Sequence, residues 1–236
     1  MRGLNLVAQL LFPAHCELCS RPLGAEPGWA PLPVRLCSTC LDELRNRAQH
    51  PEWRLDGMVV RAPFWYEDEL VCWIRQVKEG GHEALLDRLA GAWCTSPLPL
   101  EEGLRLVPVP AQALRRRERG GDHVARLAGR WARTWGLSCV QPLDRQGVSH
   151  QIGLTARERL RNLEGQYRLK ERGLRPGPVW LVDDVVTTGA TLLTCRRLLE
   201  RAGWRVRGAL ALALTPHPLL RGNALAGLEA QLDGSP

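Results

Sequence analysis

No run of apolar residues in this chain approaches the roughly 20 that a transmembrane helix needs, so the sequence excludes a helical membrane span. The apolar stretch over residues 4–12 is short and is interrupted by Asn5 and Gln9, which is not typical of a cleavable signal peptide. We therefore expect a cytoplasmic protein without membrane insertion, in a compartment that keeps thiols reduced.

The length and composition leave room for one full α/β domain and a small additional module. The chain has 236 residues, 44% of them hydrophobic, which is enough apolar material for one large core. We predict a module over residues 1–50 that includes an N-terminal helix, and a main domain over 51–215. A partly ordered tail is expected over 216–236, where Pro and Gly interrupt every periodic pattern.

Four cysteines near the start of the chain form two Cys-x-x-Cys pairs. Each pair places two thiolates on a tight turn, and the spacing between the pairs matches four-cysteine zinc ribbons. His15, beside the first pair, is an alternative ligand, and two disulfides or a site that has lost its metal are the alternatives to a zinc site. Because a reducing compartment disfavours disulfides, we predict a structural zinc ion held by Cys16, Cys19, Cys37 and Cys40.

The other four cysteines lack this spacing and have apolar neighbours. We interpret them as small core residues without a nucleophilic or redox partner. They are Cys72, Cys94, Cys139 and Cys195.

Apolar periodicity after the cysteine pairs alternates between strand and helix patterns. The segment over 144–166 is polar and irregular, and we expect it to form a mobile loop near the functional site. The expected elements are a strand or hairpin arm within 58–65, helices over 70–78 and 85–93, a strand over 104–109, a helix over 122–135 and a strand over 137–140.

The most specific pattern is an apolar strand followed by two acids and a loop of small residues. Residues 179–182 are continuously apolar, as in a strand buried on both faces of a parallel sheet. Asp183 and Asp184 follow directly, and ligands of such sheets bind at the carboxyl ends of the strands. Apolar residues then recur at helical spacing up to Gly203, which is placed to end a helix.

The chemistry of this pattern suits a phosphorylated sugar. Two adjacent carboxylates repel each other and favour hydroxyl donors or cations as partners. A small-residue loop that enters a helix presents free N–H groups to a phosphate. The structural alternative is an ordinary strand, turn and helix in which the acids only cap the helix.

This run resembles the binding motif of type I phosphoribosyltransferases for 5-phosphoribosyl-1-pyrophosphate, with Trp180 in place of a smaller aliphatic residue. The resemblance implies an α/β fold, in which a parallel sheet is flanked by helices. It also implies that Asp183 and Asp184, the catalytic candidates, contact the ribose hydroxyls and that the loop holds the 5-phosphate. The residues that it assigns to the ligand are Asp183, Asp184, Val186, Thr187, Thr188, Gly189, Ala190 and Thr191.

The order of the other segments extends the resemblance to one group. The four-cysteine module precedes a tyrosine-led helix over 66–78, a V-P-V-P strand end over 107–110 and an Arg-Gly segment at 119–120. A Q-x-x-L-x-x-x-E-R-x-x-N segment over 151–162 then precedes the sugar motif. This order is similar to the ComF family of competence-associated proteins, which join a zinc ribbon to a phosphoribosyltransferase-like domain.

The chain departs from the family where the common R-G-F-N-Q segment reads R-G-G-D-H over 119–123. By resemblance this segment borders the diphosphate. We expect His123 to lie at a helix start rather than to act as a base.

Loss of diphosphate from a ribose builds negative charge that a magnesium ion and cationic side chains stabilise. Magnesium prefers phosphate oxygens and water, so no dedicated protein site is expected for it. The candidates for the diphosphate side are Lys78, Arg119, Arg157 and Arg159, and a solvated surface position is the alternative for each.

The formal net charge of +7 comes mainly from clustered arginines over 115–119, 157–161 and 196–207. Such clusters fit DNA phosphates, a polyanionic small molecule or solvated faces equally well.

Three functions remain open at this stage. The family resemblance implies a protein that binds 5-phosphoribosyl-1-pyrophosphate with magnesium and supports DNA uptake or processing in natural transformation. Its implied partners are single-stranded DNA and a competence helicase or other DNA-processing proteins. The intact acid pair and loop instead favour an active phosphoribosyltransferase in nucleotide salvage or small-molecule metabolism. The third function is a non-enzymatic regulator that binds nucleic acid.

Overall fold

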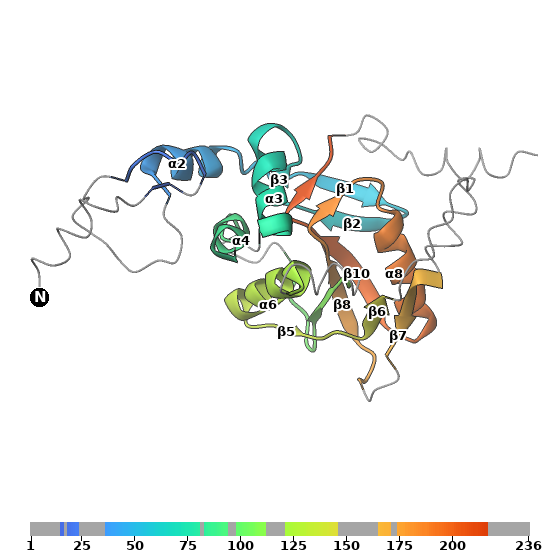
Figure 1. The fold of residues 1–236 in the computed structure, drawn as a ribbon. Coiled ribbons are helices and arrows are strands. Elements are labelled where there is room, and N and C mark those ends of the chain that lie inside the picture. The colour runs from blue at the N-terminus through green and yellow to red at the C-terminus, as the bar shows by residue number, and fades with distance from the viewer. Residues whose placement is uncertain are drawn as a thin grey trace, which may run out of the picture.

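A six-stranded sheet forms the centre of the computed structural model, which describes residues 15–16, 18–23, 36–80, 83–93, 98–111, 121–145, 165–170 and 174–216. The strand order is β1-β2-β10-β8-β4-β5, and helices cover both faces (Figure 1). Neighbouring strands from β2 to β5 run parallel, whereas β1 pairs antiparallel with β2 at the edge. The predicted α/β architecture with a mostly parallel sheet is therefore confirmed. The strands are β1 (Glu52–Leu55), β2 (Met58–Arg61), β4 (Arg105–Pro108), β5 (Ser138–Cys139), β8 (Pro178–Val182) and β10 (Arg205–Leu210).

Two smaller sheets accompany the central one. A three-stranded parallel sheet has the order β3-β11-β9, and an antiparallel pair joins β6 to β7. Because β9 starts directly after Asp184, the three-stranded sheet lies beyond the carboxyl end of β8. The bounds are β3 (Phe64–Trp65), β9 (Val185–Val186), β11 (Ala213–Leu214), β6 (Leu143–Arg145) and β7 (Tyr167–Leu169).

The side chains of β8 alternate between two hydrophobic cores. Val179 and Leu181 pack in the core that includes α8 (Ala190–Arg201). Trp180 and Val182 pack in the core formed with α3 (Asp68–Gly80), α4 (Glu83–Ala90) and α6 (His123–Trp135). This two-sided burial explains why the strand is apolar at every position.

The bulky Trp180 is accommodated by a glycine on the neighbouring strand. Gly208 of β10 is its register partner, and the register shifts between Val206 and Gly208. A Cβ at residue 208 would lie 2.5 Å from Cζ3 of Trp180, so glycine leaves the space that the indole ring occupies.

The helix predicted over 122–135 is confirmed as α6. Asp122 caps the helix through its side chain, and Gly136 ends it in the left-handed conformation with a φ of 68°. Trp131 is 1% exposed, and its ring stacks on Trp135 at 5.6 Å between centroids. Trp131 is therefore a core residue, in agreement with its position on the apolar stripe of the helix.

The second cysteine pair lies at the start of α2 (Ser38–Asn46). Leu44 of α2 is buried in the core shared with α3, α4 and α6. Arg47, just after α2, forms ion pairs with Asp68 and Glu69 in the first turn of α3. The cysteine module is thus in contact with the main domain through α3.

Several predictions fall outside the described residues: the N-terminal helix, the loop over 146–164 and most of the tail. Among the described helices, none combines the length and apolar character that crossing a bilayer requires. The arginine cluster over 196–207 is divided between α8 and β10, and some of its members form ion pairs. Arg196 contacts Glu200, and Arg207 contacts Glu101.

Candidate functional site

The two acids lie at the carboxyl end of β8, where the strand leaves the central sheet. The backbone N–H of Asp183 donates to the carbonyl oxygen of Leu210 on β10, at 2.9 Å. The N–H of Asp184 donates to Oδ1 of Asp183 at 2.8 Å, and the N–H of Val185 donates to Oδ1 of Asp184 at 2.6 Å. These bonds hold the pair in a tight turn between β8 and β9.

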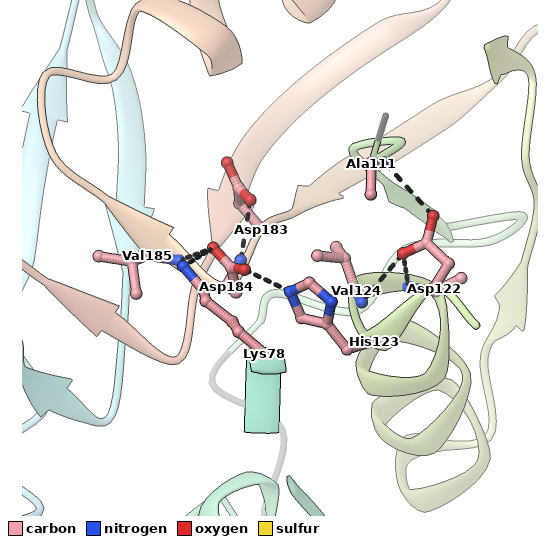
Figure 2. A network of polar contacts seen from close by, with 9 residues as sticks. Lys78, Ala111, Asp122, His123, Val124, Asp183, Asp184 and Val185 are labelled. Carbon is pink, nitrogen blue, oxygen red and sulfur yellow. Dashed lines mark hydrogen bonds and ion pairs between the residues drawn. The ribbon is translucent and has the colours of Figure 1, made fainter. Parts of the chain in front are cut away.

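Two basic side chains from different helices converge on Asp184 (Figure 2). Nζ of Lys78, in the last turn of α3, lies 3.1 Å from Oδ1 of Asp184. Nε2 of His123, the first residue of α6, contacts Oδ2. Asp184 therefore joins α3, α6 and the end of β8 at one point.

The two carboxyl groups differ in their affinity for protons. Burial and the neighbouring charge of Asp184 raise the pKa of Asp183 to about 8. Burial acts in the same direction on Asp184, but the hydrogen bond with His123 and the charge of Lys78 outweigh it and lower the pKa of Asp184. A proton shared by the pair is therefore favoured on Asp183 rather than on Asp184.

The loop after β9 leads into α8, whose first-turn backbone amides have no partner within the helix. Gly189 is the N-cap and has no side-chain cap bond, and the first backbone bond of the helix runs from Leu193 N–H to its carbonyl oxygen at 3.0 Å. The N–H groups of residues 190–192 come before the first bonded amide of the helix. The N–H of Ala190 donates to Oγ1 of Thr188 at 3.4 Å. Thr187 and Thr188 are exposed. The loop thus combines helix-start amides with accessible hydroxyls, a combination that suits a phosphate.

Gly189 is required by its conformation and by its neighbours. Its φ of 74° lies in the left-handed region. A Cβ at this position would collide with the side chain of Leu55 on β1. The close packing of the loop on β1 therefore depends on glycine.

Arg145, at the end of β6, is a second cation near the acids. Its guanidinium lies over the ring of Tyr167 at 5.2 Å, and Nη2 donates to Oε1 of Gln166 at 2.9 Å. Its positive charge lowers the pKa of Asp183, in opposition to burial. Sequence patterns held no signal for this residue, because a single arginine between polar residues is not distinctive.

The four cysteines of the two pairs come together as predicted. Their sulfur atoms all lie within 4.8 Å of one another, and the Sγ atoms of Cys19 and Cys37 are 3.8 Å apart. Tetrahedral zinc with Zn–S bonds of about 2.3 Å separates its sulfurs by about 3.8 Å. The cluster could therefore hold a structural zinc ion.

The surroundings of Cys16 favour a metal-binding thiolate. Burial acts to raise its pKa, but backbone N–H groups of Cys37, Cys19 and Leu18 directed at its sulfur bring that pKa down to about 6. Burial and hydrogen bonds with the other sulfurs raise the pKa of Cys40 instead, so the low pKa of Cys16 supplies one charged ligand of the kind that zinc requires.

The structure brings one of the four predicted diphosphate residues to the site. Lys78 contacts Asp184, whereas Arg119, Arg157 and Arg159 lie outside the described residues. His123 lies at a helix start as predicted, but its contact with Asp184 was missed. The V-P-V-P strand end before α6 could have indicated this contact. Strands β4 and β8 are parallel neighbours, so the segments that follow them, including the start of α6, lie at the same edge of the sheet.

Comparison with known proteins places the chain in a family. Competence protein F of Haemophilus influenzae is 30% identical over 209 residues, which cover 80% of this chain and 85% of that protein. This chain belongs to the competence protein F family. DNA utilization protein YhgH of Salmonella typhi is 28% identical over 226 residues, covering 82% of this chain and 94% of that protein. No protein-family model matches the sequence. The resemblance to the ComF family is confirmed.

Solved structures of phosphoribosyltransferases align with this ComF-family chain. An adenine phosphoribosyltransferase is 13% identical and gives a TM-score of 0.41. The alignment covers 78% of this chain and 93% of the adenine phosphoribosyltransferase. Orotate phosphoribosyltransferase from Aeropyrum pernix is 19% identical and gives a TM-score of 0.30. That alignment covers 82% of this chain and 86% of the orotate phosphoribosyltransferase.

Proposed function

We propose that this ComF-family protein binds 5-phosphoribosyl-1-pyrophosphate with Mg²⁺ and acts in the uptake or processing of DNA during natural transformation. The observation that carries the binding proposal is the arrangement at the end of β8. The Asp183–Asp184 pair is followed, within one strand–loop–helix unit, by a loop that presents amides and hydroxyls at the start of α8. One half of this unit suits sugar hydroxyls, and the other suits a phosphate.

The ribose is assigned to the acid pair. An ionised Asp184 accepts a hydroxyl hydrogen, and a protonated Asp183 both donates and accepts. The 5-phosphate is assigned to the loop formed by Val186, Thr187, Thr188, Gly189, Ala190 and Thr191. The positive end of α8 favours the negative charge there.

The diphosphate is assigned to the side of the acid pair that faces α3 and α6. Lys78 supplies a cation at this position, and the R-G segment that precedes α6 supplies Arg119 by family resemblance. Arg157 and Arg159 remain further candidates. Bound Mg²⁺ would neutralise charge on the diphosphate leaving group, with few ligands from the protein.

The role in DNA use rests on the names of the relatives. They are a DNA utilization protein and two competence proteins, one of them Competence protein ComFC of Streptococcus pneumoniae. We propose a cytoplasmic location, with single-stranded DNA and DNA-processing proteins such as a competence helicase as partners. We also propose that the four-cysteine cluster holds zinc and stabilises the module over residues 1–50.

An active phosphoribosyltransferase is the second candidate, and the acid pair favours it. A ribosyl transfer would break the bond between the anomeric carbon and diphosphate while an acceptor nucleophile bonds to the same carbon. Magnesium and Lys78 would stabilise the departing diphosphate. Release of diphosphate in the presence of a base or amine acceptor distinguishes this candidate from a protein that only binds.

Titration calorimetry tests the proposal directly. The zinc-loaded protein is titrated with 5-phosphoribosyl-1-pyrophosphate and Mg²⁺, alongside a double variant, Asp183→Asn with Asp184→Asn. We expect saturable binding that the double variant loses. Asp42→Asn, at an exposed position on α2, is the matched control and should bind as the wild type does. Absence of binding to the folded wild-type protein would contradict the proposal.

A further inference from the structure

His123 is a residue of the site to which the proposed function gives no role. Its backbone is fixed by Asp122, whose Oδ1 accepts the N–H groups of Val124 and Ala125 at 3.1 Å each. The second oxygen of Asp122 accepts the N–H of Ala111 at 3.3 Å. This bond ties the start of α6 to the segment that follows β4 (Figure 2). The His123 side chain therefore extends from a rigid point at the edge of the central sheet.

The imidazole is largely buried and is directed at Asp184. The side chains of His123 and Asp184 are 11% and 13% exposed. Nε2 contacts Oδ2 of Asp184, while Oδ1 receives the ammonium of Lys78 at 3.1 Å and the N–H of Val185 at 2.6 Å. Each oxygen of Asp184 is therefore engaged by a donor that comes from a different part of the fold.

Asp183 is held much less tightly. In the part of the chain that the structure describes, its carboxyl group accepts one hydrogen bond, from the N–H of Asp184 to Oδ1. The pair thus consists of an anchored acid, Asp184, and an acid with greater freedom to meet a ligand. A fixed acceptor loses less conformational freedom on binding and holds a sugar hydroxyl in a defined place.

We propose that His123 is a positioning residue for the sugar site: its Nε2–H donates to Oδ2 of Asp184 and fixes this carboxylate for the ribose hydroxyls of bound 5-phosphoribosyl-1-pyrophosphate. The inference rests on the proposed function, because it concerns the same ligand. With Asp184 ionised, the proton of the contact lies on Nε2 of the imidazole, since a carboxylate only accepts. Lys78 neutralises the carboxylate but is a flexible point charge, so the directional contact comes from His123.

Two substitutions separate the hydrogen bond from simple packing. His123→Gln keeps an N–H donor that reaches in a similar direction, and Gln is the residue of the R-G-F-N-Q segment of the family. His123→Leu keeps a comparable volume and removes the donor. Lys78 and the Asp122 cap remain in both variants.

The test compares the affinity of wild-type, His123→Gln and His123→Leu proteins for 5-phosphoribosyl-1-pyrophosphate with Mg²⁺ by titration calorimetry. We expect about a tenfold loss of affinity in His123→Leu and a change of less than about threefold in His123→Gln, because a hydrogen bond to a charged group is lost in one and kept in the other. Thermal unfolding and zinc content of each variant confirm that it is folded. Unchanged affinity in His123→Leu, or an equal loss in both variants, would overturn the inference.

A second readout tests the contact without the ligand. Nitrogen chemical shifts of the His123 ring, measured by NMR, should show the proton on Nε2 in the wild type and a changed ring environment in Asp184→Asn. A neutral ring with its proton on Nδ1 would overturn the inference. If the wild type binds no 5-phosphoribosyl-1-pyrophosphate, the proposed function is wrong and the positioning role falls with it. If the wild type binds and the substitutions have no effect, the positioning role alone is wrong.

Discussion

Gly208 of β10 and Trp180 of β8 are register partners, and the indole ring of the tryptophan fills the space that a side chain at residue 208 would need. A Cβ there would lie 2.5 Å from the ring and 2.8 Å from the carbonyl oxygen of Val59 on β2. Moving β10 away from β2 to make room for a side chain at residue 208 would break the pairing of these two strands in the sheet. The glycine and the tryptophan therefore pack directly against each other, and the tryptophan lies on the strand that leads to the acid pair.

We expect Gly208→Ala to lower the free energy of unfolding by about 1–3 kcal/mol, since overpacking a close-packed core forces side chains and backbone to shift. Urea unfolding of the two proteins measures this difference. Gly129→Ala is the matched control. Gly129 lies within α6, where the nearest atom to an added Cβ is 3.6 Å away, and alanine is the better helix former. Equal stability of Gly208→Ala and wild type would contradict the packing argument.

The raised pKa of Asp183 predicts a pH-dependent stability. Between the unfolded pKa near 3.9 and the folded pKa of about 8, the folded state keeps a proton that the unfolded state releases. The contribution of Asp183 is therefore fully present below about pH 4 and is lost as the pH rises towards 8. Asp183→Asn removes this titration, so its stability should fall less than that of the wild type between pH 5.5 and 8.5.

We expect the difference in unfolding free energy between the two proteins to change by at least about 1 kcal/mol over this range, since a tenfold change in proton affinity corresponds to about 1.4 kcal/mol. Unfolding by urea at several pH values measures it. Titration of the four clustered cysteines contributes equally to both proteins and cancels in the comparison. Parallel pH profiles would show that Asp183 is ionised at neutral pH in the folded protein.

Removal of one cysteine ligand should abolish metal binding at the module. We expect one zinc ion per wild-type chain and none in Cys37→Ser, measured by elemental analysis after gel filtration. Cys37 also caps α2, since its Sγ accepts the N–H of Cys40 at 3.4 Å, so the helix should lose stability with the metal. Cys72→Ser should keep its zinc, because Cys72 is exposed on α3 and is not the core residue that the sequence predicted. Loss of zinc in both variants would contradict the assignment of the four ligands.

Lys78 is expected to act on the diphosphate part of the ligand. Lys78→Met should weaken binding of 5-phosphoribosyl-1-pyrophosphate at least about tenfold and affect ribose 5-phosphate much less, because the second ligand lacks the diphosphate. Calorimetry with both ligands makes the comparison, and Arg75→Met on the exposed side of α3 is the control. An equal loss for both ligands would assign Lys78 to the support of Asp184 instead.

Sequence patterns predicted the parts of this protein that are encoded in one continuous stretch. The strand at β8, the acids, the loop and α8 follow one another without a gap, and the helix predicted over 122–135 is likewise one continuous segment. β1 and β10 were not predicted. The four residues of β1 alternate between exposed and buried, too short a pattern to stand out. In β10, Arg205 and Arg207 were interpreted as members of a charged cluster, although the second half of the strand is buried.

The contacts of Asp184 could not be predicted in the same way. Lys78 and His123 are far from it in sequence and reach it from two helices, so their convergence depends on strand order and helix packing. Each had a local interpretation that was sufficient by itself, namely a diphosphate-side cation and a helix start. The topology of the sheet supplies the information that the local pattern lacks.

Helix α3 connects two parts of the molecule through its opposite ends. Asp68 and Glu69 in its first turn hold Arg47 of the cysteine module, and Lys78 in its last turn holds Asp184. A helix of 13 residues is about 20 Å long, so α3 spans about this distance between the two contacts. We expect metal binding at the cysteine module and ligand binding at the sugar site to be thermodynamically linked. Each should change the affinity of the other by the same factor.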